Sequence, residues 1–204
     1  MRNLLIDELP RSVTVDGERY GISWGFRTSL LFEMLMQDPD YTDEEKLYQA
    51  MELYYPETMP TDMGKGLQAA LEFYQCGEEE TSDSEIQRLR KRSPVYSFEQ
   101  DASYIYAAFL EQYGIDLNAI ESEDLHWWKF SALFHSLGED RKISKIMYYR
   151  DAELKGKSKS EQKFLSEMKQ RYALKKKAGA QQISLERRNE QLKAYVQKRY
   201  QGAG

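Results

Sequence analysis

The side chains that most often carry out chemistry in proteins are scarce and scattered in this sequence. Its two histidines, His126 and His135, are nine residues apart, and its single cysteine, Cys76, is remote from both. Nine residues of one helix span about 13 Å along its axis, which is too far for two histidines to share an ion. Nothing in the sequence has the ligand spacing of a zinc site. We therefore expect no metal and no cofactor.

Nucleotide and acyl-transfer chemistry are disfavoured for similar reasons. Gly64-Lys-Gly66 is the only glycine pair that resembles a loop, and it lacks the spacing and the preceding strand of a phosphate-binding motif. There is no Gly-x-Ser-x-Gly elbow to expose a nucleophilic serine. The carboxylates fall at helix caps and on polar faces rather than in pairs across a cleft. We expect a protein that is not an enzyme.

Aromatic and sulfur-containing side chains, in contrast, are abundant. The chain has 15 tyrosines, 3 tryptophans and 8 methionines. Such side chains provide large contact areas for recognising another protein, although a tyrosine-rich rim around an ordinary core would give the same composition. The candidate partner-binding residues combine an apolar body with a polar tip. They are Trp128, Tyr148, Tyr149 and Arg150.

The first element that could position such residues is a β-hairpin. Val13 and Val15 alternate with polar residues, and Tyr20, Ile22 and Trp24 alternate on the return. Asp16-Gly17 between the two runs is typical of a type I′ turn. A lone hairpin is marginally stable in water, so its apolar face should pack on helices.

After Trp24 the apolar spacing becomes helical. The first helix includes Leu30–Leu35 and is expected to stop at Asp38-Pro39. Thr42 and Glu45 have the spacing of a capping box for a second helix, which should end before Pro56. Thr61 is expected to cap a third helix that ends at Gly77.

The second half of the chain contains denser apolar runs. The helix before Gly114 has apolar residues on more than one stripe, which predicts burial on two sides. Ser122 is expected to cap the next helix, whose apolar face includes His126, Trp127 and Phe130. Two or three basic helices should follow Gly138.

Charge divides the chain into an acidic body and a basic tail. Residues 141–200 contain 18 Lys/Arg and 6 Asp/Glu, a net charge of +12. Residues 1–140 contain 11 Lys/Arg and 28 Asp/Glu, a net charge of −17. Oppositely charged parts could associate head to tail between copies, or they could simply be solvated helical surfaces. The basic run Arg88–Arg92 lacks aromatic neighbours and follows an acidic stretch, so we interpret it as part of a solvated loop.

These patterns together predict a mainly α protein, a multi-helix bundle with an N-terminal β-hairpin and an extended basic C-terminal helix. No run approaches the roughly 20 apolar residues of a membrane span, and the N-terminus does not resemble a signal peptide. With its single cysteine, the chain is expected in a reducing compartment, the cytosol. Four segments are predicted: 1–77 with the hairpin and first helices, 78–95 as a flexible charged linker, 96–175 as a helical core, and 176–204 as a C-terminal helix or tail.

Several short sequence motifs, and the order in which they follow one another along the chain, resemble the gene-product-fifteen family of siphophages and of prophages in Gram-positive bacteria. The resemblance extends from the hairpin to about Leu174, and the extension from Lys175 to Gly204 lies outside it. The motifs are Gly25-Phe-Arg27, Phe73-Tyr-Gln-Cys-Gly77, Tyr96–Phe109, Tyr113-Gly-Ile-Asp-Leu117, Leu125-His-Trp-Trp-Lys-Phe130 and Lys145-Ile-Met-Tyr-Tyr-Arg150.

The resemblance implies a role in phage tail morphogenesis. It implies a tail-assembly chaperone that binds the tape-measure protein, and possibly contacts tail-tube subunits, as a partner without catalysis. Two alternatives are a structural tail component retained in the virion and a DNA-binding regulator that uses the basic C-terminal helices. The acidic body and the lack of a helix-turn-helix pattern disfavour nucleic acid as a partner.

Overall fold

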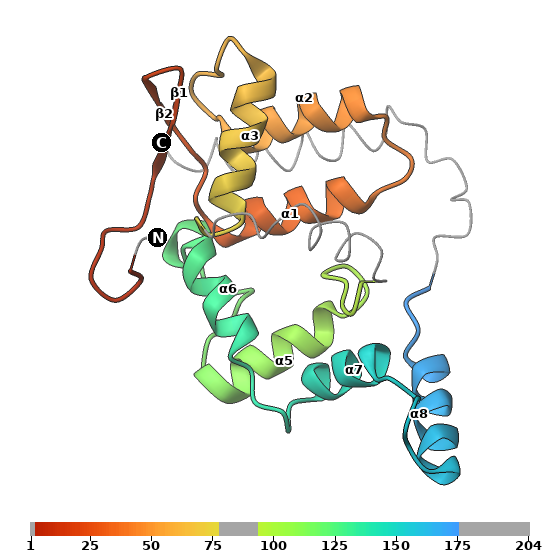
Figure 1. The fold of residues 1–204 in the computed structure, drawn as a ribbon. Helices are drawn as coiled ribbons and strands as arrows, with labels where there is room; N and C mark the ends of the chain where they lie inside the picture. The colour runs from red at the N-terminus through yellow and green to blue at the C-terminus, as the bar shows by residue number, and fades with distance from the viewer. Residues whose placement is uncertain (1–2, 78–93, 176–204) are drawn as a thin grey trace. The chain divides into compact units, whose positions relative to one another are not determined.

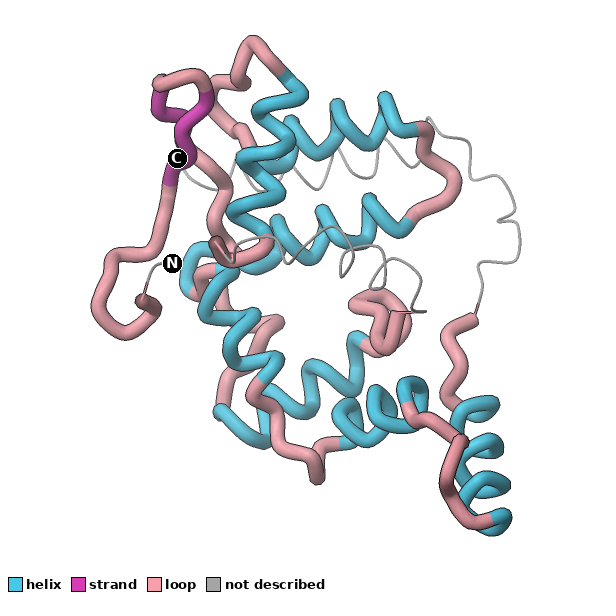
Figure 2. The backbone as a smooth tube through the Cα atoms, in the orientation of Figure 1, coloured by secondary structure: helices cyan, strands magenta, loops and turns pink. Residues whose placement is uncertain are grey.

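The described part of the protein is mainly helical, with a short hairpin near its N-terminus (Figures 1 and 2). The computed structural model describes residues 3–77 and 94–175. Its elements are β1 (Ser12–Val15), β2 (Glu18–Gly21), α1 (Phe26–Gln37), α2 (Asp43–Tyr54), α3 (Met63–Tyr74), α5 (Ala102–Tyr113), the 3-10 helix η1 (Ser122–Asp124), α6 (Trp127–His135), α7 (Lys142–Asp151) and α8 (Lys159–Arg171). The predicted fold class is confirmed for these residues. The predicted helix at 176–204 and almost all of the linker at 78–95 lie outside them.

The hairpin forms as its sequence predicts. Val13 pairs with Tyr20 in an antiparallel register, and positive φ angles of 52° at Asp16 and 84° at Gly17 define the type I′ turn. Val15 is only 5% exposed, and the β1 strand packs on α3. The apolar face of the hairpin is therefore covered by helix, as expected.

Local capping signals fix α2, whereas α3 begins and ends differently from the prediction. Thr42 and Glu45 form the predicted capping box. The third helix is capped by Asp62 rather than by Thr61, because the Asp62 carboxylate accepts a hydrogen bond from the backbone N–H of Lys65 at 3.0 Å. It ends at Tyr74 rather than at Gly77, since Cys76 and Gly77 have positive φ angles of 61° and 69°.

Helix α5 ends before Gly114, as predicted, and Gly114 has a left-handed φ of 66°. The prediction that this helix is buried on two sides is wrong. Ile105 and Phe109 are buried, but Tyr104 is 37% exposed and Leu110 is 43% exposed. One apolar stripe of α5 therefore packs in the core and another faces solvent.

Helix α6 starts later than the sequence suggests. Ser122 lies in the short 3-10 helix, and the N-cap of α6 is His126. The chain before Trp127 is held extended by a backbone bridge between Gly25 and His126, with hydrogen bonds from Phe26 N–H to the Leu125 carbonyl at 3.0 Å and from Trp127 N–H to the Trp24 carbonyl at 2.9 Å. A pairing between segments about 100 residues apart therefore overrides the local capping signal.

Two basic helices, α7 and α8, follow as predicted, and Ser158 and Glu161 form a capping box at the start of α8. Phe130 of α6 lies in the middle of the core. It stacks on Phe26 of α1 at 5.4 Å and on Phe109 of α5 at 5.0 Å between ring centroids. No helix among the described residues combines the length and apolar character needed to span a lipid bilayer.

Candidate protein-binding site

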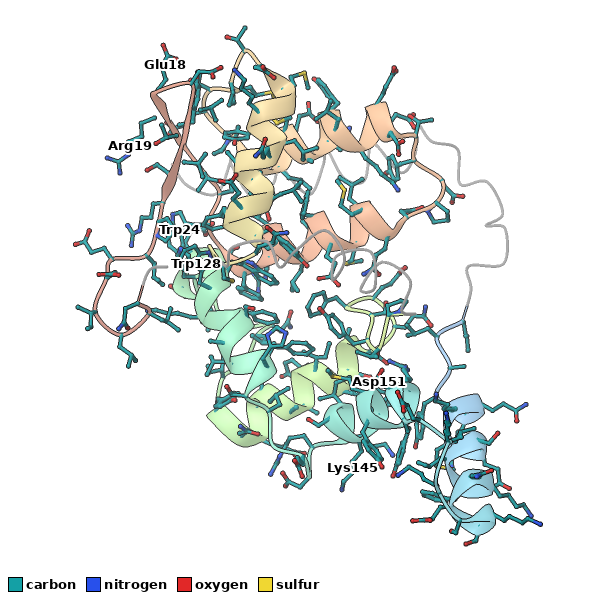
Figure 3. All side chains as sticks on the ribbon, viewed as in Figure 1. Glu18, Arg19, Trp24, Trp128, Lys145 and Asp151 are labelled. Carbon is teal, nitrogen blue, oxygen red and sulfur yellow. The ribbon has the colours of Figure 1, made fainter. Side chains whose placement is uncertain are left out.

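The two tryptophans at the start of α6 fasten this helix to the end of α3. The indole N–H of Trp127 donates to the backbone carbonyl of Tyr74 at 2.7 Å, and that of Trp128 donates to the carbonyl of Phe73 at 2.8 Å. Both acceptors belong to the last turn of α3, whose carbonyls have no partners within the helix. Trp128 and Trp24 lie where the chain after the hairpin meets the start of α6 (Figure 3).

A hollow of about 370 Å³ opens beside this junction. The chain turns at Cys76, which has a positive φ angle, two residues after α3 ends at Tyr74. Most of its wall is aromatic. We call it the aromatic hollow, and its lining residues are Tyr74, Gln75, Cys76, Tyr96, Phe98, Trp127, Phe130, Ser131, Phe134 and His135.

The rings of the aromatic hollow are fixed by their contacts with one another. Tyr74 stacks on Trp127 with centroids 5.2 Å apart, and Tyr96 meets Phe134 edge-on at 5.0 Å. Ring pairs in these arrangements favour a single geometry. The wall is therefore preorganised to receive an apolar or aromatic side chain, and little conformational freedom is lost on binding.

One carboxylate lies behind the aromatic wall. The Tyr74 hydroxyl donates to Glu33 of α1, and the Gln37 amide donates to the same carboxylate at 3.0 Å. Burial raises the pKa of Glu33, although both hydrogen bonds act in the opposite direction. Burial and the neighbouring Glu33 raise the pKa of the Tyr74 hydroxyl, which therefore stays a hydrogen-bond donor.

One histidine lies in the wall of the hollow. His135, the histidine in its wall, uses its Nδ1 atom with the carbonyl of Ser131 at 2.8 Å. Within residues 3–77 and 94–175 no three His, Cys, Asp or Glu side chains are grouped to hold a metal ion. What the arrangement can do is bury an apolar side chain of a partner.

The four residues predicted to bind a partner fall in different environments. Trp128 is 7% exposed and Arg150 is largely buried, so both side chains already have partners inside the fold. Tyr148 is 54% exposed, and Tyr149 stacks on Tyr172 with centroids 6.0 Å apart. The structure does not bring Trp128 together with the other three, and a partner-binding role for any of the four stays a prediction.

Arg150 holds α7 to the chain that borders the hollow. Its guanidinium forms a two-pronged ion pair with the Asp101 carboxylate, at 2.6 and 2.9 Å, and donates to the Val95 carbonyl at 3.0 Å. The Asp101 carboxylate also accepts the backbone N–H of Ser97 at 2.9 Å. This network fixes the segment that places Tyr96 and Phe98 in the wall.

Sequence reasoning did not identify the hollow, although three motifs that it singled out contribute to it. Phe73–Gly77 supplies Tyr74, Gln75 and Cys76, Tyr96–Phe109 supplies Tyr96 and Phe98, and Leu125–Phe130 supplies Trp127 and Phe130. Their convergence depends on indole-to-carbonyl bonds between residues more than 50 positions apart. The sequence did not indicate that Glu33 lies next to the hollow, because a single acidic residue in an amphipathic helix is usually on its solvated face.

A family model described as Bacteriophage Gp15 protein matches residues 5–174. No curated protein and no solved structure matches the chain.

Proposed function

The chain belongs to the family described as Bacteriophage Gp15 protein, and from that membership we propose that it is a phage tail-assembly chaperone or a related morphogenesis factor. In this role it binds the tape-measure protein in the cytoplasm of the bacterial host and assists assembly of the tail tube without catalysing a reaction. The family match supports the phage origin. The tail role and the client are the proposal.

The observation that carries the proposal is the aromatic hollow. A tape-measure protein is a long, helical, amphipathic client, and an amphipathic helix presents apolar side chains every three or four residues. A hollow of about 370 Å³ has room for one large apolar side chain of such a helix. Tyr74 and Tyr96 in its wall are half-buried and the phenylalanine and tryptophan rings are buried, an aromatic lining that resembles the pockets that receive anchor residues at protein interfaces.

The expected strength of such a contact suits a chaperone. Burying one Leu, Met or Phe side chain contributes roughly 1.5–3 kcal/mol. A single anchor therefore gives weak and reversible binding, and a long client needs many copies of the chaperone along its length. Contacts of this kind can be released when tail-tube subunits replace them.

Co-expression tests the proposal. The full chain is produced together with the tape-measure protein of the same phage genome, and the soluble fraction of the tape measure is compared with that in cells lacking the chain. We expect the chain to raise this fraction and to co-purify with the tape measure. If the fraction is unchanged and the two proteins separate on the first affinity step, the proposal is wrong.

Analysis of purified phage particles separates the chaperone from a structural tail component. A chaperone acts during assembly and is released, so mass spectrometry of mature virions should detect the tail-tube protein and the tape measure without this chain. Stoichiometric amounts of the chain in the virion would instead support the structural alternative.

A further inference from the structure

Two exposed surfaces of the described fold have opposite charge, and each includes at least one exposed aromatic ring. The first lies on α7 and α8, where Tyr148 is 54% exposed and Phe164 is 50% exposed. Tyr149 links them, with its ring 5.8 Å from Tyr148 and 6.0 Å from Phe164. The same two helices carry exposed lysines, of which Lys142 contacts the Tyr172 ring, together with a smaller number of exposed carboxylates. We call this the basic aromatic surface, and its residues are Lys142, Lys145, Tyr148, Tyr149, Lys163, Phe164 and Tyr172.

The second surface lies on α2. Glu44, Tyr48 and Glu52 are four residues apart, so they share one face of the helix. Tyr48 is 48% exposed, and its hydroxyl bonds with the Glu52 carboxylate, which raises the pKa of that hydroxyl. With the neighbouring Asp43, these residues form what we call the acidic stripe.

The charge around each surface has the same sign as the surface itself. Residues 141–172 contain ten Lys/Arg and four Asp/Glu, a net charge of +6. Residues 3–77 contain five Lys/Arg and fourteen Asp/Glu, a net charge of −9. Complementary fields of this kind steer association and fix orientation more than they add affinity. The exposed aromatic rings in both surfaces supply apolar area that the charges alone lack.

We propose that the basic aromatic surface of one copy docks on the acidic stripe of a second copy. Both surfaces are exposed in a single copy, so each is available to a neighbour. The contact joins two different patches and is therefore head-to-tail, and repeated contacts of this type build a ring or an open filament. The contact does not involve the aromatic hollow, so it is independent of the proposed client.

The physics predicts a weak and salt-sensitive contact. Ion pairs between exposed side chains contribute little individually, and at 1 M ionic strength the Debye length shrinks to about 3 Å. We expect self-association at high protein concentration in about 20 mM salt, weakened by about tenfold or more in 0.5 M salt. The full chain is used in every measurement.

Charge reversal on each surface gives the decisive test by sedimentation velocity. The double variant Glu44→Lys/Glu52→Lys and the double variant Lys145→Glu/Lys163→Glu should each lose self-association, because each removes one of the two complementary partners. Mixed in equal amounts, the two variants should associate with each other, since the reversed stripe now complements the reversed basic surface. The matched control, Glu57→Lys/Glu139→Lys, changes exposed carboxylates outside both surfaces and should behave as the unaltered protein.

Three results would overturn the proposal. One is an unaltered protein that stays monomeric at about 0.5 mM in low salt. Another is a pair of reversed variants that both lose self-association yet fail to restore it when mixed, although circular dichroism shows that both are folded. The third points to nucleic acid: Lys145→Glu/Lys163→Glu would abolish binding to a mixed-sequence single-stranded oligonucleotide and leave self-association intact.

Discussion

At the scale of single residues, a buried ion pair and a buried histidine hold the fold in place. The Arg150 guanidinium and the Asp101 carboxylate are 9% and 3% exposed, and they satisfy each other through two hydrogen bonds. His126 is 5% exposed and bonds at both ring nitrogens. Each group is tolerated inside the protein because its partners are provided, so removing a partner should be costly.

Replacing Arg150 by methionine should destabilise the fold by about 3–5 kcal/mol, because Asp101 is left buried without its counter-charge. Chemical denaturation followed by circular dichroism measures the effect. The double variant Arg150→Met/Asp101→Leu should recover part of the loss, since it removes the uncompensated charge. As a control, Lys65→Met breaks an exposed ion pair with Asp16 and should leave the denaturation midpoint nearly unchanged. A small effect of Arg150→Met would contradict the buried pair.

The hydrogen bonds of His126 define its protonation state. Its Nδ1 accepts the backbone N–H of Trp128 at 3.1 Å, so Nε2 carries the proton and donates to the Pro10 carbonyl at 3.0 Å. Burial lowers the pKa of His126 from its ordinary value of 6.5. Protonation would also place a second N–H against that of Trp128.

The stability of the protein should therefore depend on His126 below neutral pH. The unfolded chain takes up a proton near pH 6.5 while the folded chain does not, so the contribution of this residue is complete above that pH and is lost as the pH falls further. Urea denaturation between pH 7.5 and 5 measures the slope. His126→Gln keeps a donor and an acceptor but does not titrate, and its profile should be flatter than that of the unaltered protein. Parallel profiles for the two proteins would show that His126 does not titrate as described.

At the scale of elements, features encoded within a few residues were predictable from the sequence. The Asp16-Gly17 turn and the capping box of Thr42 each depend on residues at most three positions apart. The start of α6 was not predictable, because it depends on the backbone bridge between His126 and Gly25, which lie about 100 positions apart. Neither helix propensity nor the periodicity of apolar residues shows that two such distant segments pair.

Gly25 provides a test of this long-range junction. A Cβ atom at this position would collide with the Ser122 Oγ atom and lie 2.7 Å from the Ser122 carbonyl oxygen, so the backbone would have to move. We expect Gly25→Ala to destabilise the fold by about 3 kcal/mol, at the upper end of overpacking effects. At Gly21 the nearest atom to such a Cβ is the Glu57 Oε2 atom, 3.9 Å away, and Gly21→Ala should be nearly neutral. Equal thermal midpoints for the two variants would contradict the close approach of Gly25 to Ser122.

At the scale of the whole molecule, composition and charge indicated the kinds of surface that the protein has but not their positions. The abundance of tyrosine suggested aromatic recognition surface, but it could not show which rings line the hollow and which face solvent. Tyr74 and Tyr96 line the hollow, whereas Tyr148 is exposed on α7. That distinction depends on how α3 meets α6, a tertiary contact that the sequence pattern does not specify.

The aromatic hollow is central to this account, and filling it gives the most direct test. Ser131 lies in its wall and is half-buried, so the indole of Ser131→Trp would occupy the space that a client side chain needs. Ser103→Trp places the same indole on the exposed face of α5, outside the hollow, and serves as the matched control. Both variants must show the circular dichroism spectrum and thermal midpoint of a folded protein.

The decisive measurement is the affinity of the two variants for the tape-measure protein, determined by quantitative co-purification. A lost apolar anchor corresponds to roughly 1.5–3 kcal/mol, and every 1.4 kcal/mol is about tenfold in affinity. We predict that Ser131→Trp weakens binding by about tenfold or more while Ser103→Trp binds as the unaltered protein does. Equal binding by both variants would contradict the claim that the hollow receives the client.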